Sequence, residues 1–187
     1  MNQWRKGIAQ WKVGNTLYLS VPFTWLIKDA EFIASQHKGK VLIGGSGTMT
    51  KTECEGFEPI LFHNPCATFT TRGCINNCGF CAVPKIEGEF REIENFRPAP
   101  VICDNNILAS SHKHFERVME LSRKFPLVDF NQGLQASLLT PWHLDQMARL
   151  KKVKIRFAFD NIGLETKVHD AVTMCRERGF KDIGIYC

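Results

Sequence analysis

The segment "CATFTTRGCINNCGFC", residues 66–81, joins a strand-like run to a compact group of cysteines. Its first half is rich in threonine and contains a phenylalanine, which predicts a strand over residues 66–73. Cys74, Cys78 and Cys81 follow directly with the spacing C-x3-C-x2-C. A strand that ends in a loop of three thiols therefore organises this part of the chain, and the segments after the loop decide the fold.

Beyond the loop, strand-like and helix-like segments alternate. Strands are predicted over residues 98–108, 127–134, 153–160 and 181–187, and helices over residues 112–125, 140–152 and 164–179. Strands that alternate with helices of this length indicate parallel β/α units with right-handed connections. The predicted fold class is α/β. In such folds the chemistry lies at the carboxyl ends of the strands, where this chain carries polar residues.

The first fifty residues predict a smaller α/β segment, residues 1–50. Strand composition covers residues 15–23, apolar residues at helical spacing cover residues 25–39, and a short buried strand is predicted over residues 40–47. Glycine at position 39 predicts the end of the helix.

The composition is that of an ordinary globular protein. The chain has 187 residues, of which 44% are hydrophobic and 23% charged, and a net charge of +5. No stretch approaches the roughly 18 apolar residues of a membrane span, and no signal peptide is evident, so we predict a cytoplasmic protein with reduced thiols and no membrane contact. The charge permits an RNA partner without arguing for one.

The cysteine triplet has two chemical interpretations. A structural zinc site uses four ligands, and Cys66 or Cys103 is available as the fourth, which would make the protein a zinc-stabilised binding module. An iron–sulfur cluster takes one cysteine for each iron, so three cysteines would leave one iron of a [4Fe–4S] cluster open to a small molecule.

The stretch "CINNCGFC", residues 74–81, resembles the C-x3-C-x-aromatic-C motif of radical S-adenosylmethionine (SAM) enzymes. The resemblance covers residues 66–187 and implies a partial (β/α) TIM-like barrel, truncated after its fifth strand where the family usually has six. It implies that Cys74, Cys78 and Cys81 hold a [4Fe–4S] cluster whose open iron binds SAM. Reductive cleavage of SAM to a 5′-deoxyadenosyl radical would use an electron donor such as flavodoxin or ferredoxin, on an unknown substrate.

The same resemblance implies a set of cofactor-binding residues: Phe80, Asp104, Asn105, Asn106, Gln132, Asp160 and Asn161. Phe80 would lie near the adenine of SAM, and residues 104–106 would contact its amino group. Residues 160 and 161 match the fourth-strand position that often binds the ribose hydroxyls. No catalytic residue is visible as a motif.

Two branches of the family compete. "CGFCAVPKIEGEFR", residues 78–91, is similar to the tRNA methylthiotransferases, which act on RNA and carry three further cysteines upstream, whereas this chain has only Cys54 and Cys66 there. "KVLIGGSG" and "FNQGLQASLLT" resemble the cobalamin-binding-domain type, although no Asp-x-His-x-x-Gly motif occurs. We favour the second branch, with residues 1–50 as a vestige of a cobalamin-binding-like domain.

Overall fold

The computed structural model describes residues 4–51 and 57–186. The chain divides into two compact units, each described by itself. The N-terminal unit comprises Met1–Cys66 and Asn77–Gly88, and the sheet unit comprises Ala67–Asn76 and Glu89–Cys187. Cys54 and Cys187 lie outside the described residues. Within those residues, no helix is long and apolar enough to cross a membrane.

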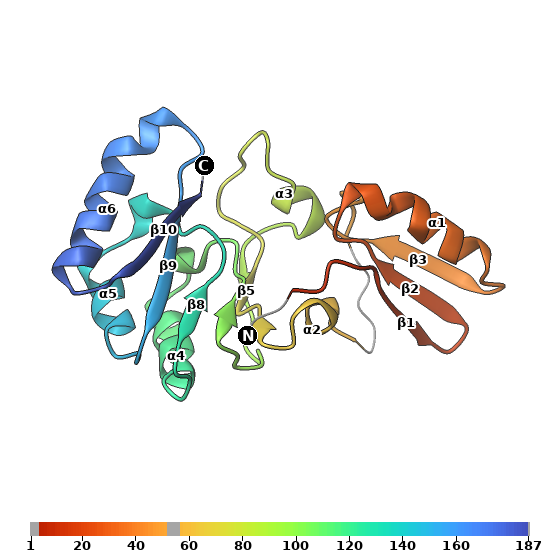
Figure 1. Ribbon diagram of the computed structural model, residues 1–187, viewed down its shortest axis with the longest axis horizontal. Helices are drawn as coiled ribbons and strands as arrows, with labels where there is room; N and C mark the ends of the chain where they lie inside the picture. The colour runs from red at the N-terminus through yellow and green to blue at the C-terminus, as the bar shows by residue number, and fades with distance from the viewer. Residues whose placement is uncertain (1–3, 52–56, 187) are drawn as a thin grey trace. The chain divides into compact units, whose positions relative to one another are not determined.

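The N-terminal unit is a three-stranded sheet with a helix packed on it (Figure 1). Its strands are β1 (Ala9–Val13), β2 (Thr16–Ser20) and β3 (Lys40–Gly44), and its helices are η1 (Thr24–Leu26), α1 (Ile27–Ser35), α2 (Pro59–His63) and α3 (Val83–Ile86). β1 and β2 form an antiparallel hairpin, and β3 pairs parallel to β2. Leu17, Leu19, Val21 and Ala30 form the buried core between α1 and the sheet.

The strand–helix–strand order predicted for the N-terminal segment is confirmed in β2, α1 and β3. The prediction that β3 is buried is wrong, since only Gly44 of that strand is buried. The reason is that β3 is an edge strand of a sheet covered by one helix. Strand β1 was not predicted, although the Gly14-Asn15 pair between β1 and β2 is a typical hairpin turn.

The sheet unit contains a five-stranded parallel sheet in the order β10-β9-β8-β7-β4. The sheet consists of β4 (Ala67–Thr68), β7 (Val101–Ile102), β8 (Val128–Phe130), β9 (Val153–Ala158) and β10 (Asp182–Tyr186). The unit also contains β5 (Thr71–Arg72) and β6 (Arg91–Glu92), which pair with each other. The helices of the sheet unit are η2 (Ile107–Ala109), α4 (His112–Ser122), η3 (Ala136–Leu138), α5 (Pro141–Met147), η4 (Ile162–Leu164) and α6 (Glu165–Glu177). The predicted α/β class with parallel β/α units is confirmed. Closure of the strands into a barrel stays a prediction.

The two faces of the five-stranded sheet differ. Figure 1 shows α4, α5 and α6 on one side of the sheet. Along β9, Val153, Ile155 and Phe157 are buried in the core that these helices share. The alternate residues of β9 point to the opposite face, where Arg156 pairs with Asp129 of β8 through two hydrogen bonds. The face opposite these helices thus carries a charged pair on β8 and β9.

The predicted continuous strand over residues 66–73 is wrong, because the chain divides there into β4 and β5. β4 pairs with β7 in the parallel sheet, whereas β5 pairs antiparallel with β6. At the break, the backbone N–H groups of Thr70 and Thr71 donate to Asp104 Oδ1 at 2.6 and 2.9 Å. A buried carboxylate thus takes two donors that a continuing strand would give to a neighbouring strand.

Helix α5 begins at a capping box formed by Thr140 and His143. We expect the loss of this capping box to lower the free energy of unfolding only slightly. Thr140 Oγ1 accepts from His143 N, and Thr140 N donates to His143 Nδ1 at 3.3 Å. Burial, together with nearby His112, lowers the pKa of His143 to about 4, so its ring is neutral and Nδ1 accepts. Thr140→Ala should lower the free energy of unfolding by about 1 kcal/mol in urea denaturation. Thr173→Ala on the exposed side of α6 should change it by less than about 0.5 kcal/mol. Equal effects of the two changes would contradict this assignment.

Candidate functional site

Asp104 anchors the start of the cysteine loop in the sheet unit. It follows β7, is 3% exposed, and accepts hydrogen bonds from Thr70 N, Thr71 N and Thr70 Oγ1. Burial raises the pKa of Asp104 to about 6, although these hydrogen bonds oppose the rise. The carboxylate that the sequence assigned to the SAM amino group is therefore turned toward its own neighbouring strand, where it fixes the direction of the chain toward Cys74.

A cluster of three side-chain amides surrounds Cys74. Gln135 Oε1 accepts from Asn76 Nδ2 at 2.7 Å and from Asn106 Nδ2 at 2.8 Å. The sulfur of Cys74 in turn accepts from the Asn76 backbone N–H at 3.4 Å and from Asn106 Nδ2 at 3.8 Å. We call Asn76, Asn106 and Gln135 the amide cluster. It joins the loop after β5 to the segments that follow β7 and β8.

The segment after β8 forms backbone hydrogen bonds with β9, and this contact brings Gln135 to the amide cluster. Leu134 N donates to Arg156 O at 2.7 Å, and Ala158 N donates to Leu134 O at 3.1 Å. Gly133 makes this approach feasible, since a Cβ atom there would lie 2.9 Å from the Cβ of Ala158. Glycine at position 133 therefore has a packing reason, and the bend that it allows carries Gln135 to the carboxyl end of the sheet.

Asn106 is the most buried member of the amide cluster. It is 2% exposed, and its Oδ1 has no hydrogen-bond partner among the described residues. A buried amide oxygen without a partner is unfavourable, and such atoms often mark the place of a ligand. This orphaned acceptor, on a side chain whose Nδ2 contacts Cys74, fits the contact with the SAM amino group that the sequence assigned to residues 104–106.

The other two cysteines belong to the N-terminal unit. Cys81 N donates to Cys78 O at 2.9 Å, so the two residues flank a tight turn. Phe80 between them is 71% exposed, and Cys78 is exposed as well. In the described part of the chain, no three His, Cys, Asp or Glu side chains converge as metal ligands do. The structure thus defines the surroundings of Cys74 separately from those of Cys78 and Cys81.

The remaining predicted cofactor residues lie after the strands named by the sequence. Gln132 is exposed in the segment after β8, while Gln135 of the same segment reaches the amide cluster. Asp160 and Asn161 are exposed directly after β9, and Asn105 is partly buried beside Asn106. The structure brings Cys74 and Asn106 together and leaves Gln132, Asp160 and Asn161 at the surface.

Sequence reasoning missed Asn76 and Gln135. Asn76 lies inside the cysteine motif itself, between Cys74 and Cys78, where only the thiols attracted notice. Gln135 lies three positions after Gln132 in a segment without regular secondary structure. No helical or strand periodicity therefore indicates which of the two side chains points inward. A signal was nonetheless present, because Gly133 marks a close approach of the backbone just before Gln135.

The environment of Cys74 fits an iron–sulfur ligand. Its sulfur receives two N–H donors, as the sulfurs of cluster ligands commonly do, and the Oδ1 atom of the donor Asn106 has no partner among the residues that the structure describes. Cys103 fits a metal poorly, because burial and the charges of Asp104 and Asp129 raise the pKa of its thiol to about 12. Of the two cysteines named as a fourth zinc ligand, this argues against Cys103.

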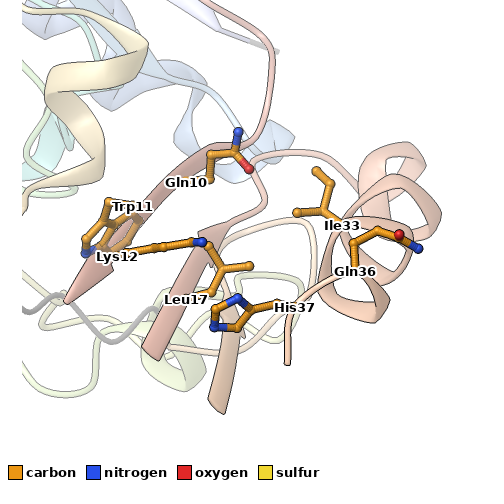
Figure 2. Close-up of a pocket in the computed structure, with 7 residues that line it drawn as sticks. All are labelled: Gln10, Trp11, Lys12, Leu17, Ile33, Gln36 and His37. Carbon is orange, nitrogen blue, oxygen red and sulfur yellow. The ribbon is translucent and has the colours of Figure 1, made fainter. Parts of the chain in front are cut away.

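The N-terminal unit has a cavity of its own, about 420 Å³ in volume (Figure 2). Lys12, Leu17 and Ile33 contribute to its walls, and Figure 2 shows Lys12 extending across the hairpin toward Leu17. His37 at its edge lies 3.1 Å from the carbonyl oxygen of Asn15 through its Nε2 atom. None of the predicted cofactor or cluster residues lines this cavity.

Comparisons of the chain with protein-family models, curated proteins and solved structures found no match. Its function must therefore be inferred from the cysteine spacing, the parallel sheet and the groups around Cys74.

Proposed function

We propose that this protein is a radical SAM enzyme, in which Cys74, Cys78 and Cys81 bind a [4Fe–4S] cluster and leave one iron open for SAM. The observation that carries the proposal is the C-x3-C-x-aromatic-C motif in the segment that follows β4, the first strand of a sequentially ordered parallel sheet, and the short strand β5. The two N–H donors on the sulfur of Cys74 support it, because hydrogen bonds of this kind stabilise a metal-bound thiolate.

Different residues of this chain would bind the cluster, position the cysteine loop and bind SAM. Cys74, Cys78 and Cys81 hold the cluster, and Asp104 holds the loop that carries Cys74 through Thr70 and Thr71. Asn106 Oδ1, buried and unpaired among the described residues, would accept a hydrogen bond from the amino group of SAM. When bound, the cluster supplies the electron that cleaves SAM to a 5′-deoxyadenosyl radical.

The proposal assigns further groups to the nucleoside part of SAM. Phe80 would contact the adenine, and Gln132, Asp160 and Asn161 would bind polar atoms of the cofactor from the ends of β8 and β9. Their present exposure leaves their side chains accessible to a ligand. A partial TIM-like barrel, the reducing cytoplasm and a flavodoxin or ferredoxin as electron donor belong to the same proposal. In its methylthiotransferase-like form the substrate would be RNA.

Anaerobic reconstitution with iron and sulfide tests this function. The wild-type protein should turn brown, bind about four irons for each chain, and form 5′-deoxyadenosine from SAM once dithionite is added. Omitting dithionite is the matched control and should leave SAM intact. A colourless protein that holds one zinc ion tightly would overturn the proposal in favour of a zinc-stabilised binding module.

A further inference from the structure

We propose that Asn106 and Gln135 are positioning residues that direct N–H donors at the sulfur of Cys74 and thereby set the reduction potential of the cluster. This inference rests on the proposed function and names a role for side chains that the cysteine motif does not include. Its starting observation is the amide cluster, in which one carbonyl oxygen, Oε1 of Gln135, binds both Asn76 and Asn106.

The first step concerns the orientation of the amides. Because Gln135 Oε1 accepts from both asparagines, each must present its Nδ2 group toward Gln135. Gln135 is itself held, since its Nε2 donates to Ser137 Oγ at 2.9 Å. The orientation of Asn106 is thereby fixed, with its NH₂ group between the glutamine oxygen and the sulfur of Cys74 and its Oδ1 turned away.

The second step concerns charge at the sulfur. A cluster-bound cysteine carries negative charge, and each added electron makes the cluster and its ligands more negative. The Asn76 backbone N–H and Asn106 Nδ2 both point partial positive charge at Cys74 Sγ. Such donors stabilise the reduced cluster more than the oxidised one, and burial of Asn106 strengthens the effect because little water screens it.

The third step concerns the source of this arrangement. Gln135 comes from the segment after β8 and Asn106 from the segment after β7, whereas Cys74 and Asn76 lie in the loop after β5. Asn106 therefore contacts the sulfur of Cys74 directly, and Gln135 acts on it through Asn106 and Asn76. Loss of the Gln135 oxygen would free both asparagine side chains, so a change that does not touch Cys74 should still alter the cluster.

Gln135→Met tests the assignment, because methionine has nearly the same length and no strong acceptor. The reconstituted wild type and variant are compared in a redox titration followed by electron paramagnetic resonance, without SAM. We expect iron content to be unchanged and the one-electron reduction equilibrium to shift about tenfold toward the oxidised cluster, which is about 59 mV to more negative potential. Asn95→Leu, at an exposed position of the same unit, is the control and should leave the potential unchanged.

The outcomes separate this inference from the proposed function. If the wild type binds no cluster, both are overturned. If the wild type binds a cluster whose potential is the same in Gln135→Met, only the positioning role is overturned. Loss of iron from Gln135→Met with an unchanged circular dichroism spectrum would also overturn the role, because the amides would then be needed to bind the cluster and not to set its potential. If that variant does not fold, Asn106→Leu decides, because it removes the Nδ2 donor to the sulfur of Cys74, and an unchanged potential there overturns the role.

Discussion

Replacing Cys78 by alanine should reduce the reductive cleavage of SAM by more than about 100-fold, beyond the 10–100-fold that changes outside the ligand set commonly cost. The reason is that each cluster cysteine holds one iron, so the loss of one thiolate leaves two protein ligands instead of three. The measurements are iron content after anaerobic reconstitution and the amount of 5′-deoxyadenosine formed. Cys74→Ala and Cys81→Ala should behave in the same way.

The cysteines outside the motif provide the controls for this result. Cys175 is fully buried in α6, where burial raises the pKa of its thiol to about 11, so Cys175→Ala should retain both the cluster and the cleavage of SAM. Cys66 is exposed, and its replacement distinguishes a zinc site, in which it could be the fourth ligand, from an iron–sulfur cluster, which does not use it. If Cys66→Ala released metal as completely as Cys78→Ala, and the metal were zinc, a four-cysteine zinc site would replace the radical SAM interpretation.

Replacing Asp104 by alanine should lower the free energy of unfolding by about 3–4 kcal/mol. The change leaves the N–H groups of Thr70 and Thr71 and the hydroxyl of Thr70 without their buried acceptor. Urea denaturation followed by circular dichroism measures the loss, and the control Asp170→Ala on the exposed surface of α6 should cost less than about 0.5 kcal/mol. A loss in Asp104→Ala as small as that control would contradict the anchoring role.

Asp104→Asn separates the charge of this side chain from its hydrogen bonds. Asparagine keeps an acceptor for Thr70 N and Thr71 N, so it should be more stable than Asp104→Ala at pH 7. Burial raises the pKa of Asp104 to about 6 from its ordinary 3.8, so between these values the folded state binds more protons than the unfolded state. The contribution of Asp104 to stability should therefore fall as pH rises through this window.

The difference in unfolding free energy between wild type and Asp104→Asn, measured from pH 3.5 to 7, isolates this contribution from the other titrating groups. It should shift in favour of the asparagine variant as pH rises between about 4 and 6. A difference that does not vary with pH would show that Asp104 titrates normally in the folded protein.

The alternation of strands and helices could be predicted because it depends on local patterns. The spacing of apolar residues in residues 112–125 and 164–179 gives α4 and α6, and the alternation of apolar and polar residues that begins at Val153 gives β9. The order β7-β8-β9-β10 follows from the same alternation, since α4, α5 and α6 each return the chain to the next position in the sheet. The cysteine motif, likewise, is a matter of spacing alone.

Only the tertiary structure determined which polar side chains meet at the end of the sheet. The sequence pointed to Gln132, and the contact of Gly133 and Leu134 with β9 brings Gln135 of the same segment to Asn106 and Asn76. It also predicted one strand over residues 66–73, whereas Asp104, which follows a different strand, ends β4 by binding Thr70 and Thr71. These outcomes depend on partners more than twenty residues away, and no local pattern encodes such partners.

The sequence by itself thus determined the α/β class, the succession of parallel strands and the three closely spaced thiols. The tertiary structure decided how the first of those thiols is surrounded, because hydrogen-bond partners are chosen by the register of strands distant in sequence. Asn106 and Gln135 acquire their relation to Cys74 only when β7 and β8 lie side by side in the sheet.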